Sequence, residues 1–114
     1  MKTKNKKIIQ KILNNEKIQK KIYKNINNVL KKIKKLKQFI NSLNYQYKLS
    51  FKKFYYTKYF KNNRDLVNFR DNIQLKIYNF SLQIENYDNE LLKLNRKIIQ
   101  LTNEHVNLNI LYNK

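Results

Sequence analysis

The chain has 114 residues, with 26 Lys and Arg against seven Asp and Glu, and a formal net charge of +19. It contains one His and no Cys, Gly, Pro, Trp or Ala. These absences exclude a disulfide framework, a thiolate metal site and the Gly-rich loops that cradle phosphates. No apolar run approaches the roughly 20 residues of a membrane span, and at this length one domain is the ceiling.

Apolar residues alternate with steps of four and three in the first part of the chain. Asn15 and Gln19 interrupt this register with polar side chains. The apolar members are Ile8, Ile12, Ile22, Ile26, Val29, Ile33, Leu36, Ile40 and Leu43. Heptads sustained in this way are typical of coiled-coil helices, so we expect helix one to cover about residues 5–60.

Residues 45–60 fit two interpretations, and they hold eight of the fifteen aromatic residues. The residues that fit a helical face are Tyr47, Phe51, Phe54 and Tyr55. However, Tyr45, Tyr47, Leu49 and Phe51 also alternate as in a strand. We favour a helix, because no turn sequence such as Asn-Gly separates two strands. The alternative is an aromatic, basic loop between two shorter helices.

Asn62-Asn63-Arg64-Asp65 is the best turn candidate in the chain. We place the turn at about residues 61–64, with Asn63 or Asp65 capping helix two, which is expected at about 65–112. Only Arg70 and His105 break its 4-3 alternation. The other seam members are Leu66, Ile73, Ile77, Phe80, Ile84, Tyr87, Leu91, Leu94, Ile98, Leu101, Leu108 and Tyr112.

The two seams can be paired in an antiparallel arrangement centred on this turn. Ile26 then faces Leu101, and Ile40 faces Tyr87. His105 faces Ile22, as a polar break near the open end. The sequence therefore predicts an all-α fold: one basic domain, residues 1–114, forming a long antiparallel two-helix coiled-coil hairpin with an aromatic and basic segment near its turn.

Codon bias explains part of the charge but not its distribution. Lys, Asn, Ile, Tyr and Phe make up 72 of the 114 residues and have A/T-rich codons, which indicates an AT-rich genome. Residues 1–63 nevertheless hold 19 Lys and one acid, Glu16, whereas residues 64–114 hold seven bases and six acids. The same bias acted on both halves, so the first half is expected to face an anionic partner.

The residues that we expect to bind RNA lie on this basic half and at the tip. The tip is the aromatic and basic segment next to the turn, residues 48–64. The backbone-binding set is Lys20, Lys21, Lys24, Lys31, Lys32, Lys34, Lys35, Lys48, Lys52, Lys53, Lys58, Lys61 and Arg64. The candidates for stacking on bases are Phe54, Tyr55, Tyr56 and Tyr59. The alternative for the lysines is a solvated helix face filled by codon bias, and for the rings it is core packing or contact with a neighbouring protein.

No catalytic, metal-binding or cofactor-binding constellation can be assembled from this sequence. His105 has no second His or Cys at ligand spacing, and the carboxylates Glu85, Asp88 and Glu90 fit a solvated helix face. We therefore expect a protein that is not an enzyme and that has no metal, cofactor, small-molecule substrate or membrane span.

The preferred interpretation is an RNA-binding structural subunit of a large ribonucleoprotein: a ribosomal protein of an AT-rich organelle, with ribosomal RNA and neighbouring proteins as partners. It would then be organelle-encoded and reside in the matrix of a mitochondrion or plastid. The alternative location is the cytoplasm of an AT-rich organism. The alternative functions are a coiled-coil scaffold, for which self-association is an option, and a DNA-binding nucleoid or plasmid protein.

Overall fold

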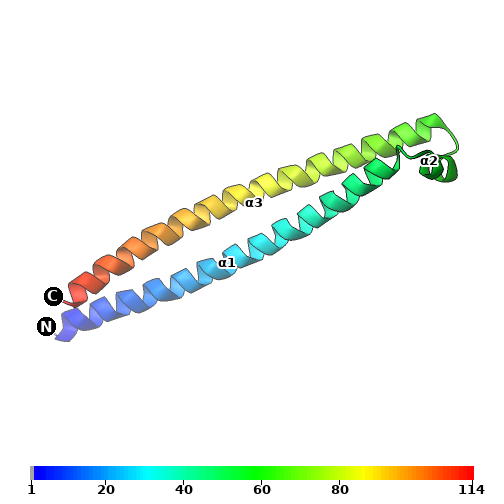
Figure 1. Cartoon of the computed structure of the whole chain (residues 1–114). Helices are drawn as coiled ribbons and strands as arrows, with labels where there is room; N and C mark the ends of the chain where they lie inside the picture. The colour runs from blue at the N-terminus through cyan, green and yellow to red at the C-terminus, as the bar shows by residue number, and fades with distance from the viewer. Residues whose placement is uncertain (1) are drawn as a thin grey trace. The chain divides into compact units, whose positions relative to one another are not determined.

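The computed structural model describes residues 2–114 and contains three helices (Figure 1). They are α1 (Lys2–Leu49), α2 (Lys53–Tyr59) and α3 (Asn63–Tyr112), and this described part has no strand. The expectation of an all-α chain is therefore confirmed. The absence of Gly and Pro fits two helices of about 50 residues, since no residue in either strongly opposes helix formation.

Helix α1 ends at Leu49, so the expectation of a continuous helix to about residue 60 was wrong. Hydrogen bonds of the 3-10 type follow, each to the carbonyl three residues earlier: the Phe51 amide donates to Lys48, and the Lys52 amide donates to Leu49. The Ser50 hydroxyl donates to the Tyr47 carbonyl at 2.6 Å. This local bond competes with helix continuation, and Lys52 then takes an extended conformation.

The turn into α3 lies where the Asn-rich sequence predicts it, although the capping residue differs. Phe60 is extended and ends α2. The Asn62 side chain accepts a hydrogen bond from the Asp65 amide at 2.8 Å, so Asn62 is the cap of α3, in place of Asn63 or Asp65. Asp65 lies in the first turn of α3, where its charge suits the helix dipole.

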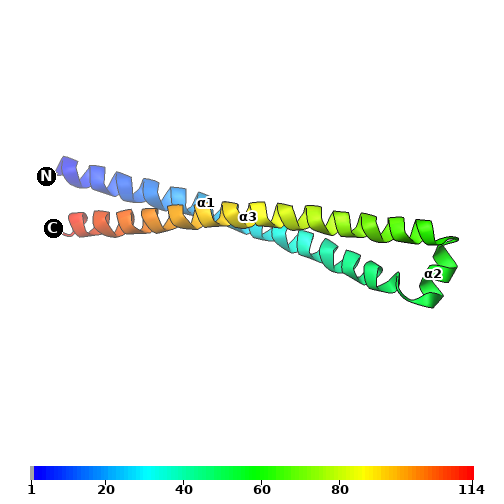
Figure 2. The ribbon, with the colours of Figure 1, turned by 90° about the horizontal axis from the view of Figure 1, so that it is seen from above.

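The described chain divides into two compact units, which share the two long helices. The first consists of the residues of α1 up to Leu30 together with Asp88–Lys114. Within it the N-terminal part of α1 and the C-terminal part of α3 lie side by side (Figure 2). One hollow of about 780 Å³ is lined by Asn5, Lys7, Ile8 and Lys11 and by residues 111–114, so these ends of α1 and α3 are neighbours.

The second unit, Lys31–Tyr87, contains the rest of α1, all of α2 and the first part of α3. The rings of Phe39 and Phe80 lie 5.7 Å apart between their centroids. The Lys32 ammonium lies 5.7 Å from the centre of the Tyr87 ring. From Lys32 to Phe39 the residue numbers rise along α1, whereas the numbers of the α3 residues that they contact fall from 87 to 80. The two helical segments are therefore antiparallel within this unit.

The predicted seam is the shielded stripe of each helix. On α3, every predicted seam residue from Leu66 to Leu108 is buried or half-buried, with Arg70 and His105 included. On α1, the same holds from Ile8 to Leu43, and the polar Asn15 is only 4% exposed. The heptad period thus located the apolar faces of both helices.

The predicted register between the seams was wrong. His105 lies beside Glu16 rather than Ile22, and the Leu101 carbonyl meets Asn15 rather than Ile26. In the second unit, Tyr87 lies near Lys32 rather than Ile40. The observed partners differ from the predicted ones by about one heptad along the helices. A shift of one heptad leaves the same seam faces of α1 and α3 in contact. Its physical cause is that α1 ends at Leu49 and that polar side chains meet each other in the first unit.

Candidate nucleic-acid interface

All lysines of the predicted RNA-binding set on α1 are exposed, because they occupy helix positions outside the apolar seam. In the first unit these residues are Lys20, Lys21 and Lys24. In the second unit they are Lys31, Lys32, Lys34, Lys35 and Lys48. Each unit therefore presents several cationic side chains to solvent on its α1 segment.

These charges are not neutralised by carboxylates of the same chain. Within residues 5–114, the one contact of an acid with a basic side chain within 4.0 Å is that of Glu16 with His105. Two lysines lie near aromatic rings instead: Lys32 near Tyr87, and Lys35 at 5.9 Å from the centre of the Phe39 ring. The α1 surface is thus free to attract a polyanion.

The tip of the second unit carries the remaining predicted cations and rings. Lys52, Lys53, Lys58, Lys61 and Arg64 are all exposed there. No acid occurs between Glu16 and Asp65, so residues 17–64 carry basic charges alone, and Asp65 follows in the first turn of α3. Helix α2 has no buried residue, which means that its side chains contribute more to the surface than to a core.

The four predicted stacking rings divide into two groups. Phe54 is 70% exposed and Tyr59 is 60% exposed, whereas Tyr55 and Tyr56 are half-buried. Tyr55 packs against Tyr59, with 4.8 Å between ring centroids, and also approaches Phe60 at 6.4 Å. The Lys58 ammonium lies 5.4 Å from the centre of the Tyr59 ring. Phe54 is thus the most exposed ring of the set.

A hollow of about 430 Å³ lies at this tip, and the sequence did not predict it. Its lining comes from α2, the following turn and the start of α3: Tyr56, Thr57, Phe60, Lys61, Asn62, Asn63, Leu66 and Arg70. Phe60 is held against Phe69, with 4.9 Å between their ring centroids. That packing fixes one aromatic wall, and no pattern in the sequence distinguishes Phe60 from the neighbouring rings.

Arg70, which interrupts the α3 seam, holds the end of α1. Its guanidinium donates to the Ser50 carbonyl at 2.8 Å and to the Ser50 hydroxyl at 3.1 Å. It also lies 3.8 Å from the centre of the Phe51 ring. Ser50 is fully buried, so these bonds satisfy a carbonyl at a helix end that lacks a helical partner. A positive charge at a helix C-terminus is also favoured by the helix dipole.

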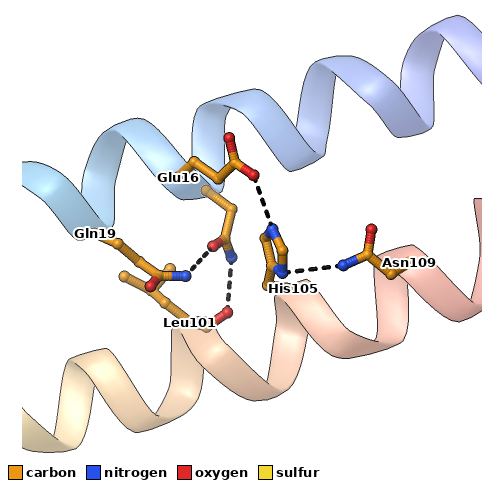
Figure 3. A network of polar contacts seen from close by, with 6 residues as sticks. Glu16, Gln19, Leu101, His105 and Asn109 are labelled. Carbon is orange, nitrogen blue, oxygen red and sulfur yellow. Dashed lines mark hydrogen bonds and ion pairs between the residues drawn. The ribbon is translucent and has the colours of Figure 1, made fainter.

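A polar layer lies across the first unit (Figure 3). Asn15 donates to the Leu101 carbonyl at 2.9 Å and accepts from the Gln19 amide at 2.6 Å. The His105 Nε2 atom lies 3.2 Å from a Glu16 carboxylate oxygen, and the Asn109 amide nitrogen lies 3.1 Å from Nδ1. An imidazole with its proton on Nε2 satisfies both contacts. The contacts of Asn15 with Leu101 and of Glu16 with His105 therefore link α1 to α3 within this unit.

Helix α3 exposes apolar residues outside its seam. Within the first unit, Leu92, Ile99 and Val106 follow one another at seven-residue intervals and are each more than half exposed. Residues at this spacing lie on one face of a helix. The periodicity of the sequence does not distinguish these residues, because the seam residues have the same spacing.

Two kinds of site are not formed by the part of the chain that the structure describes. No three His, Asp or Glu side chains within it come together in an arrangement that can hold a metal ion. Its helices also lack a segment with the length and apolarity needed to cross a lipid bilayer.

Comparison of the chain with protein-family models, with curated proteins and with solved structures finds no match.

Proposed function

We propose that this chain is an RNA-binding structural subunit of a large ribonucleoprotein, a ribosomal protein of an AT-rich organelle. The observation that carries the proposal is the exposed lysine array of α1 and the tip, which no carboxylate of the described residues neutralises. Lysines in such an array bind phosphates and release counterions from nucleic acid. The A/T-rich codon bias supports the organellar assignment, with the matrix of a mitochondrion or plastid as its location.

In this proposal the whole chain is an antiparallel two-helix coiled-coil hairpin. The shielded 4-3 seams of α1 and α3 support it. The opposite directions of the paired segments support it in the second unit, where Lys32 meets Tyr87 and Phe39 meets Phe80. In the first unit, residues 5–11 meet 111–114 and Asn15 meets Leu101. The basic surface then lies on RNA backbone and recognises it by shape, as is usual for double-stranded RNA. The role is architectural: binding, with no chemical step.

A coiled-coil scaffold is the second candidate, and one observation favours it. Leu92, Ile99 and Val106 form an exposed apolar stripe on a helix whose charges nearly balance. Such a stripe suits contact with a neighbouring protein. A scaffold role predicts association that persists in high salt, whereas RNA binding weakens steeply as salt rises.

Sedimentation of native lysate from the source cells, with and without ribonuclease, tests these candidates. We expect the protein, followed by mass spectrometry, to migrate with a ribosomal subunit and to shift after ribonuclease treatment. Migration in a small complex that is indifferent to ribonuclease would contradict the RNA-binding role and favour the scaffold. A shift caused by deoxyribonuclease alone would identify a DNA-binding protein.

A further inference from the structure

We propose that the hollow at the tip of the second unit binds one unpaired nucleotide of the RNA. This inference rests on the proposed function and adds a ligand class to it. The lysine array attracts any polyanion, whereas this hollow combines aromatic walls, amide groups and a cation in about 430 Å³.

Tyr56 and Phe60 provide the apolar part of the hollow. Tyr56 is half-buried, and Phe60 is positioned by its packing against Phe69 and Tyr55. A ring that is already held in place, such as that of Phe60, loses little conformational freedom when a base stacks on it. Stacking on aromatic side chains is the usual way in which proteins hold bases that are not paired.

Asn62 and Asn63 provide the polar part. The Asn62 oxygen already accepts from the Asp65 amide, which leaves the Asn62 nitrogen as a donor. The side chain of Asn63 offers both a donor and an acceptor. Such amides suit the edges of a base, and Lys61 on the rim suits its phosphate. Arg70 also lines the hollow but is engaged by Ser50, so we assign it no contact with the nucleotide.

The occupant is a nucleotide rather than another apolar group because of the charges around the hollow. Residues 56–66 carry three exposed bases, Lys58, Lys61 and Arg64, against one acid, Asp65. A duplex cannot place a base in the hollow unless the base leaves its pair, so RNA loops and bulges are the expected ligands. Phe54 lies outside the lining and is not part of this site.

Fluorescence anisotropy at one salt concentration, with the full chain, tests the proposal. The two probes are an RNA hairpin with an unpaired loop and a continuous duplex of the same stem sequence. We expect about tenfold tighter binding of the hairpin, since stacking of one base contributes about that much. The Tyr56→Leu variant keeps an apolar side chain and removes the ring, so it should lose this preference while its duplex affinity stays within about twofold.

Tyr78→Leu is the matched control, because Tyr78 is 60% exposed on α3 and lies outside the hollow. It should keep the preference for the hairpin. Asn63→Ala, which leaves both aromatic walls in place, should weaken the preference. 4-Thiouridine in the loop should crosslink to the peptide that contains residues 56–66.

An equal affinity of the unsubstituted protein for the two probes, or an unchanged preference in Tyr56→Leu, overturns this inference and leaves the proposed function intact. Failure to bind either probe removes the proposed function itself. Loss of the preference on adding micromolar free adenosine monophosphate assigns the hollow to a free nucleotide, which overturns an RNA occupant.

Discussion

Helices α1 and α3 have the same kind of buried stripe and different outer surfaces. Both shield a 4-3 alternation of Ile and Leu. Outside this stripe α1 exposes lysines, whereas α3 exposes a balanced set of charges and apolar residues such as Leu92 and Ile99. One codon bias acted on both helices, so the difference supports the proposal that their outer surfaces meet different partners: an anion on α1 and a protein on α3.

Substitution of a residue in the buried stripe, which both helices have, should change the stability of the protein more than any other substitution proposed here. Ile73→Ala removes a side chain that is only 3% exposed, and we expect it to lower the free energy of unfolding by about 3 kcal/mol. Ile99→Ala on the same helix removes a side chain that is 60% exposed, so its effect should stay within about 0.5 kcal/mol. Urea unfolding followed by circular dichroism measures both, and equal losses would contradict the assigned seam.

The outer surfaces can be compared by removing three charges from each helix. Lys20, Lys24 and Lys31 changed together to Gln should weaken RNA binding at least about tenfold and reduce the salt slope by about one for each phosphate that is no longer bound. Lys76, Lys93 and Lys97 on α3 are also exposed and provide the matched control, with a much smaller expected effect. Anisotropy titrations over a salt series measure both variants. Equal weakening would mean that only total charge matters.

Arg70 tests whether a polar seam residue of α3 stabilises α1. Arg70→Met keeps apolar volume but leaves the buried Ser50 carbonyl without its donor, which should cost about 2 kcal/mol. Arg64→Met, at an exposed site, is the control. Chemical denaturation gives the change in stability. Faster hydrogen exchange at the amides of Phe51 and Lys52 should locate it, and unchanged exchange there would count against this role.

The smallest effect is expected at the polar layer. Asn15→Ile combined with His105→Leu replaces polar seam residues by apolar ones, and we expect stability to rise by about 1 kcal/mol or to stay unchanged. The cost should appear as a loss of unique register, because a seam without polar members can shift by a heptad. Amide NMR spectra should then show more than one set of signals. A single sharp set would mean that other interactions fix the register.

The periodicity of the sequence predicted the features that depend on neighbouring residues within one helix. It did not predict the features that depend on contacts between residues far apart in the sequence. The seams of both helices and the exposure of the lysines follow from residue spacing. The end of α1 depends on Ser50 and on Arg70, which approaches it from another helix. The register depends on Asn15 meeting Leu101 and on Glu16 meeting His105. The hollow depends on Phe60 packing against Phe69.

The hydrogen bonds of Ser50 and Asn15 also imply an order of folding. The bond between Ser50 and Arg70 closes a loop of 20 residues, whereas the bond from Asn15 to Leu101 spans 86. Loop closure alone makes the longer-range bond about 1 kcal/mol more costly. In the proposed hairpin, pairing should therefore nucleate at the short loop and propagate toward the chain ends. Arg70→Met should then slow folding, and Asn15→Ala should mainly speed unfolding. A wrong register adopted early would then be destabilised at the end of folding, because the side chains of the polar layer could not form their hydrogen bonds.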